Sequence, residues 1–209
     1  MAPQQRGILF HILDVFFNIV VIVAIVAGIR TFLVSPFQVE GSSMDDTLED
    51  RQYIIINKLA FLIGSPERGD VVVFNPPTGD HRKYYVKRVI GLPGDAVIIK
   101  NGYVYLRKAG EEEVRKLDEE YLNDRNLGNT YRHPPSSGDK SQAEFVVAPN
   151  AYFLLGDNRM GSLDSRSFTE RETGEPSPFV AEKDIKGRVW FVALPVTKIH
   201  ALSPPEYGF

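Results

Sequence analysis

The chain has 209 residues, of which 43% are hydrophobic and 24% charged, and its formal net charge is −3. This composition is that of a folded protein and excludes a disordered or fibrous chain. The slightly acidic balance argues against a nucleic-acid partner, because binding to phosphate backbones requires clustered cations. The absence of cysteine excludes disulfides, thiolate catalysis and cysteine-ligated metals, and the four histidines are scattered without metal-ligand spacing.

The most apolar segment lies near the start of the sequence. Between residues 15 and 29 the one polar side chain is Asn18, and apolar residues continue to Val34. A segment of about 20 such residues is long enough to cross a bilayer as a helix. We therefore predict a single uncleaved transmembrane anchor within residues 1–36, with a cleavable signal peptide and a buried core helix as the alternatives. Orientation is poorly determined, because one arginine stands on each side of the segment.

From residue 37 onward the pattern changes to short segments rich in Val, Ile, Tyr and Phe, bounded by Gly, Pro, Asn and Asp. Such closely spaced strands predict a mainly β domain over residues 37–209, an antiparallel sandwich or barrel. Asn101-Gly102 between two of the segments is typical of a tight hairpin. The predicted strands are residues 52–57, 70–74, 84–90, 96–100, 103–106, 144–147, 151–155 and 188–192.

Two parts of this domain lack a clear strand pattern. Residues 107–150 include an acidic run at 111–120 and a polar loop, which predict a solvated insertion or small subdomain without a catalytic role. Residues 201–209 are expected to form a loose tail. A Ser-x-x-Lys match at Ser137 and Lys140 lies inside the polar loop, and we interpret it as a chance match.

Three other segments carry the side chains most suited to chemistry. A Gly-Ser-Ser sequence within residues 37–48 gives the backbone freedom to aim N–H groups at one point, as an oxyanion hole requires. Lys87 lies in an apolar strand, where desolvation favours the neutral amine that can act as a general base. Residues 156–166 combine alternating charges with serines, which indicates a structured polar network. No histidine lies in a comparable setting, so a Ser-His-Asp triad is not predicted.

Together these segments resemble the type I signal peptidases, membrane-bound Ser-Lys proteases that remove signal peptides from exported proteins. The similarity covers the apolar segment and then four ordered blocks, up to Val192. The blocks are SMDDTL at 43–48, RGDVVVF at 68–74, KRVIGLPGD at 87–95 and GDNRMGSLDSR at 156–166. The last two blocks are long and specific, and four blocks in the same order are very improbable by chance.

The resemblance implies a role for each matching residue. Ser43 would be the nucleophile, Lys87 the general base and Ser162 the side chain that orients the lysine amine. The remaining matches imply ion pairs of Arg88 with Asp157 and of Asp164 with Arg166, and shallow pockets for small substrate residues lined by Phe37, Val39, Leu48, Tyr85 and Val86. No metal or organic cofactor is implied.

Two positions depart from the family pattern. The usual proline after Met-x is Asp46 here, and a carboxylate near the site would favour the charged form of Lys87. Gly41 stands where some members place a serine whose hydroxyl serves the oxyanion hole. The hole would then use the Ser43 N–H and a second donor that the sequence does not identify.

The resemblance implies a single-pass protein of the plasma or inner membrane, with its catalytic domain on the outer face. Its partners would be the signal peptides of preproteins and the lipid bilayer. An association with the secretion machinery is a further implication. The alternatives are a catalytically weak or specialised relative dedicated to a few precursors, a non-catalytic, membrane-tethered β-domain that binds peptides, and a self-cleaving Ser-Lys transcriptional repressor. The repressor would require a DNA-binding domain where this sequence has its apolar segment.

Overall fold

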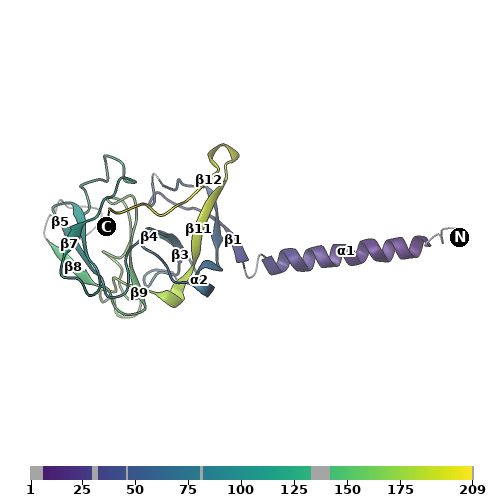
Figure 1. Ribbon diagram of the computed structural model, residues 1–209, viewed down its shortest axis with the longest axis horizontal. Helices are drawn as coiled ribbons and strands as arrows, with labels where there is room; N and C mark the ends of the chain where they lie inside the picture. Colours follow the sequence, from purple (N-terminus) through teal and green to yellow (C-terminus); the bar gives the residue numbers. More distant parts are fainter. Residues whose placement is uncertain (1–6, 30–32, 46, 81, 133–141, 209) are drawn as a thin grey trace.

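The computed structural model describes residues 7–29, 33–45, 47–80, 82–132 and 142–208. It consists of one long N-terminal helix and a β-domain built from two antiparallel sheets. Figure 1 shows the helix extending away from the β-domain, with the smaller sheet at the opposite end of the molecule. The predicted mainly β architecture after an N-terminal apolar helix is therefore confirmed.

Helix α1 covers Ile8–Gly28 and carries apolar side chains on all sides. At 1.5 Å per residue its 21 residues span about 31 Å, close to the thickness of a bilayer core. None of its side chains is buried, so the alternative of a buried core helix is wrong, and the helix is consistent with a membrane anchor. It begins before the predicted apolar segment, and Val34 starts a strand instead of ending the helix. Pro36, two residues later, cannot continue a helix, which explains this boundary.

The larger sheet forms the body of the β-domain. In spatial order its strands are β1 (Val34–Gln38), β2 (Tyr53–Asn57), β11 (Ile185–Leu194), β3 (Val71–Phe74), β4 (Tyr85–Gly91), β9 (Ala151–Leu155) and β10 (Val180–Ala181), while β12 (His200–Ala201) pairs with β11. The central strands β3 and β9 are buried throughout, in agreement with their unbroken apolar and aromatic sequences. Short helices connect the strands, namely α2 (Ala60–Ile63) and the 3₁₀ turns η2 (Glu182–Asp184) and η3 (Val196–Lys198).

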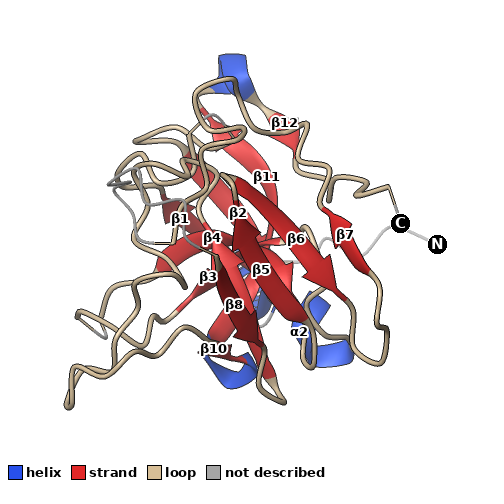
Figure 2. Ribbon diagram, turned by 90° about the vertical axis from the view of Figure 1, so that its left-hand side faces the viewer, coloured by secondary structure: helices blue, strands red, loops and turns tan. Residues whose placement is uncertain are grey.

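The smaller sheet lies in front in Figure 2. Its strands follow the spatial order β7 (Val114–Lys116), β6 (Tyr103–Arg107), β5 (Ala96–Lys100) and β8 (Ala143–Val146). Strands β5 and β6 are joined by Asn101-Gly102, and both residues have positive φ, 54° and 83°. These angles fit the type I′ turn that the dipeptide predicts.

The pairing of strand β4 with its two neighbouring strands determines where Lys87 lies. On one side it pairs with β3 from Tyr85 to Arg88. On the other side its pairing with β9 begins only at Arg88. In the described part of the chain, residues 85–87 therefore have one strand neighbour. The Lys87 side chain contacts Ser43 in the loop that follows β1.

Two expectations for the β-domain are wrong. The acidic run is not entirely solvated, because Glu119 is buried with only 3% of its surface exposed. The last residues are not a loose tail, because Tyr207 is buried and its ring packs against Tyr121. The predicted domain boundary after residue 36 falls inside β1, and the limits of the insertion at about 107–150 stay a prediction.

Candidate active site

Ser43 lies in the loop between β1 and β2, which two buried side chains hold in place. Met44 and Leu48 both belong to the core cluster beneath the loop, and Leu48 N–H donates to Met44 O at 2.8 Å. Gly41 has a φ of +88° and its N–H donates to Asp50 Oδ1 at 2.8 Å. The Gly41 N–H is thus already engaged, so it is not the second oxyanion donor that the sequence left unidentified.

Lys87 reaches Ser43 from the side of β4. Its Nζ lies 2.6 Å from Ser43 Oγ and donates to Val86 O at 2.8 Å. Only 3% of the lysine surface is exposed. Two side chains that are 44 residues apart in the sequence are therefore in direct hydrogen-bond contact, with the lysine buried and Ser43 half-buried.

Burial lowers the pKa of Lys87 from its ordinary value of 10.5 to about 8. The carboxylates of Asp164 and Asp157 act against this shift, and the nearby Arg166 guanidinium adds to it. Desolvation dominates because an ammonium loses more hydration energy on burial than a neutral amine does. A useful fraction of the lysine is consequently neutral at mildly alkaline pH, and a neutral amine can accept the serine proton.

Residues 156–166, here called the site loop, follow β9 and pack beside Lys87. Asp157 forms a buried ion pair with Arg88, with 2.7 Å between Oδ2 and Nη2, and it also accepts from Thr47 Oγ1 at 2.5 Å. Asp164 pairs with Arg166 at 2.7 Å and accepts from the Gly156 N–H at 3.0 Å. Both ion pairs implied by the resemblance are present in the structure.

These pairs fix the charge states around the lysine. Burial alone would raise the pKa of Asp164, but the Arg166 guanidinium and the hydrogen bonds from Gly156 and Ser162 together outweigh it and hold that pKa below the ordinary value. Burial alone would lower the pKa of Arg88, but the attraction of Asp157 raises it above the ordinary value. Asp164 and Arg88 therefore stay ionised while Lys87 titrates beside them.

Ser162 is buried next to Gly156, so close that a Cβ on the glycine would lie 2.1 Å from Ser162 Oγ. Only glycine fits at position 156 for this reason. The Ser162 side chain lies beside the Asp164 carboxylate and helps to lower its pKa. The predicted orienting bond of Ser162 to the lysine amine stays a prediction.

A cleft of about 660 Å³ opens beside Ser43 and Lys87. Four of the five predicted substrate-contacting residues line it, namely Phe37, Val39, Tyr85 and Val86. Leu48 does not, because it is fully buried in the core cluster next to Val39. Besides Gly41, Ser43 and Lys87, the cleft has further lining residues to which the sequence assigned no substrate contact. They are Gln38, Glu40, Ser42, Ile54, Val73, Arg82, Lys83, Tyr84, Gly161 and Leu163.

Among the described residues, no group of three or more His, Asp or Glu side chains is arranged to hold a metal ion. Two positions singled out in the sequence, Asp46 and the Ser137–Lys140 match, lie outside the described residues.

The chain is similar to known proteins over most of its length. The family model described as "Signal peptidase, peptidase S26" matches residues 12–194. The chain belongs to this family. "Signal peptidase I S" of Bacillus subtilis (strain 168) is 38% identical over 169 residues, which cover 78% of this chain and 84% of that protein. "Signal peptidase IB" of Staphylococcus aureus (strain COL) is 34% identical over 209 residues, which cover 94% of this chain and 96% of that protein.

A solved structure of a signal peptidase I from Enterococcus faecalis V583 aligns with 61% of this chain and 98% of its own, at 27% identity and a TM-score of 0.43. The family resemblance that the sequence blocks indicated is confirmed by the family match and by the two relatives. The chain is thus an S26 serine peptidase by family.

Proposed function

We propose that this protein removes N-terminal signal peptides from exported preproteins, with Ser43 as nucleophile and Lys87 as general base. The observation that supports this most directly is the 2.6 Å contact between Ser43 Oγ and the buried Lys87 Nζ. Membership of the peptidase S26 family supports the substrate class, because the relatives are named signal peptidases.

The reaction follows the pattern of an activated nucleophile. Neutral Lys87 takes the proton of Ser43 as its oxygen attacks the scissile carbonyl, and the resulting ammonium gives that proton to the departing amine. An acyl-enzyme on Ser43 remains. Lys87 then accepts a proton from the water that attacks the ester carbonyl. As the bond between Ser43 Oγ and the acyl carbon breaks, the ammonium returns that proton to Oγ, which releases the signal peptide with a free carboxylate and restores the neutral amine.

The shape of the cleft supports a preference for small residues before the cut, of the Ala-x-Ala type. Val39 and Val86 line the cleft, and both are branched apolar side chains that fill space close to Ser43. A shallow apolar pocket of this kind accepts a methyl group and excludes larger side chains by overlap. The substrate would lie extended along the free edge of β4 next to Lys87, adding a strand to it.

The apolar helix supports a place at the plasma or inner membrane. In this proposal the β-domain lies on the outer face, where preproteins emerge. Anchoring both the enzyme and its substrate in one bilayer raises their effective concentration, so a weak intrinsic affinity suffices. Association with the secretion machinery belongs to the same proposal and has no separate support in the structure.

The decisive test uses the full chain in detergent with a peptide that contains an Ala-x-Ala site. We expect one cut after the second alanine, seen by mass spectrometry of both products. A peptide with Leu in place of that alanine should remain uncut. Absence of any cleavage of the first peptide under conditions where the protein is folded would contradict the proposal, and so would equal cleavage of both peptides.

The pH dependence of kcat/KM should show the state of the lysine. Because the amine must be neutral and its pKa is lowered to about 8, kcat/KM should rise about tenfold per pH unit below that value and level off above it. A rate that continues to rise beyond pH 9 would mean that the catalytic lysine is not desolvated. The profile is measured with the Ala-x-Ala peptide, with thermal unfolding recorded at each pH.

A further inference from the structure

Residues 117–131, here called the back segment, belong to the insertion for which the sequence predicted no catalytic role. The structure packs them against the site loop. Met160 N–H donates to Asn126 Oδ1 at 3.3 Å, and Arg166 Nη1 donates to Tyr131 O at 3.2 Å. The back segment thus touches the site loop near its middle and at its end.

The strongest contact joins Glu119 of the back segment to Arg159 of the site loop. Arg159 is completely buried, and its two terminal nitrogens lie 2.6 and 3.1 Å from the two Glu119 oxygens. Thr130 Oγ1 accepts from the same guanidinium at 2.9 Å, and the Tyr121 hydroxyl accepts from it at 3.0 Å. Because both charges are desolvated, removing the carboxylate would leave a buried cation without its counter-charge.

Arg159 connects this ion pair to the reacting serine. Its Nε donates to Gly156 O at 3.1 Å. Gly156 lies directly against the Ser43 backbone, since a Cβ there would be 2.5 Å from Ser43 O. Asn158 lies between Gly156 and Arg159 in the sequence, and its N–H donates to Ser43 O at 3.2 Å. A shift of Arg159 therefore moves the groups that hold the Ser43 backbone.

The same back segment also supports the strand that carries the lysine. The ring of Tyr121 stacks on the Arg88 guanidinium, 4.1 Å from ring centre to Cζ. Arg88 is the neighbour of Lys87 on β4, and the Nε and Nη2 edge of its guanidinium pairs with Asp157. The Tyr121 hydroxyl in turn donates to Glu119 Oε1 at 3.0 Å.

We propose that Glu119 is a positioning residue for the Ser43–Lys87 pair, acting through Arg159. The inference rests on the proposed function, because it assigns a role within the same site. No residue of the back segment lines the substrate cleft, nor does Arg159. Loss of Glu119 should therefore slow the chemical step more than it weakens substrate binding.

The test compares Glu119→Ala with the wild-type chain in detergent, using the Ala-x-Ala peptide. A serine-directed acylating probe counts the competent sites, so that kcat is expressed per titrated site. We expect kcat per site to fall about tenfold or more while KM changes less than about threefold, because a small misplacement of reacting groups is costly. If the alanine variant fails to fold, Glu119→Gln takes its place. It keeps the side-chain shape and one acceptor, so its kcat per titrated site should fall, but by less than is expected for alanine.

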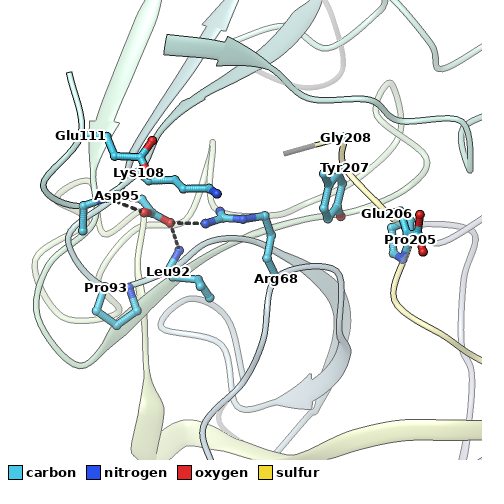
Figure 3. Close-up of a pocket in the computed structure, with 11 residues that line it drawn as sticks. Arg68, Leu92, Pro93, Asp95, Lys108, Glu111, Pro205, Glu206, Tyr207 and Gly208 are labelled. Atoms are coloured by element: carbon cyan, nitrogen blue, oxygen red, sulfur yellow. Dashed lines mark hydrogen bonds and ion pairs between the residues drawn. The ribbon is translucent and has the colours of Figure 1, made fainter. Parts of the chain in front are cut away.

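The matched control is Asp95→Asn, which disturbs another buried ion pair without touching the site loop. Asp95 pairs with Arg68 at 2.9 Å and accepts from the Leu92 and Ala109 N–H groups, beside a separate pocket of about 850 Å³ (Figure 3). This variant should lower thermal stability but leave kcat per titrated site unchanged.

The outcomes separate the two proposals. Failure of the wild-type chain to cleave overturns the proposed function. Suppose that the wild-type chain cleaves and that Glu119→Ala keeps the wild-type kcat per titrated site, with only fewer titratable sites or a higher KM. Glu119 is then purely structural, and the inference is overturned. An equal fall of kcat per site in Asp95→Asn overturns it as well.

Discussion

The Ser43→Ala variant is expected to lose signal-peptide cleavage, with kcat lower by about 10⁴-fold to 10⁶-fold, because no other group can form the acyl-enzyme. The side chain is half-buried in a loop held by the core residues Met44 and Leu48, so removing one oxygen should leave the fold intact. The measurement is turnover of the Ala-x-Ala peptide, together with thermal unfolding of both proteins.

Ser65→Ala is the matched control for this variant. Ser65 is exposed, and its hydroxyl donates to Glu182 outside the site. The same chemical change there should leave turnover within about twofold of wild type, as is usual for surface substitutions. Turnover by Ser43→Ala close to that of wild type would show that a different group attacks the carbonyl.

The strands were predictable because their composition carries the signal locally. Each of the eight predicted segments is a strand, and seven of them match the structure to within one residue at either end. The four unpredicted strands are short or atypical. Strand β1 contains Pro36. Proline has no backbone N–H to donate to a neighbouring strand, so it argues against predicting a strand there. It is tolerated because β1 has only one strand neighbour among the described residues.

The site was only partly predictable, because its contacts join residues far apart in the sequence. An apolar strand around Lys87 indicates a neutral amine, but it does not indicate which serine the amine reaches. The family blocks supplied that pairing. Glu119 shows the limit of local patterns: within an acidic run it reads as solvated, and its burial depends on Arg159, 40 residues away.

Leu48 is a second residue whose place in the site the sequence did not predict. The resemblance implied a substrate contact, yet the loop turns so that Leu48 packs in the core with Met44 and Val39. Val39 belongs to the same core cluster and does line the cleft. A single sequence cannot distinguish these two positions, because both side chains are apolar.

Lys87→Met should be as inactive as Ser43→Ala and yet more stable than wild type at neutral pH. The pKa of Lys87 is about 8 in the folded protein against an ordinary value of 10.5. Below pH 8 both the folded and the unfolded chain hold the proton, so the wild type bears the full cost of a buried ammonium. Each tenfold change in a protonation equilibrium is worth about 1.4 kcal/mol, so the gain of the methionine variant should be roughly 1–3 kcal/mol.

The stability gain of Lys87→Met over wild type should decrease as the pH rises. Between about pH 8 and 10.5 the unfolded wild-type chain binds more protons than the folded one, so wild-type stability rises with pH across this window. The advantage of Lys87→Met should shrink accordingly. Urea unfolding at pH 6.5 and pH 9.5 measures it, with Lys100→Met, an exposed lysine on β5, as the control that shows no such change. A methionine variant that is less stable than wild type at pH 6.5 would mean that Lys87 is held in its charged form by Asp157 and Asp164, and the neutral general base would have to be abandoned.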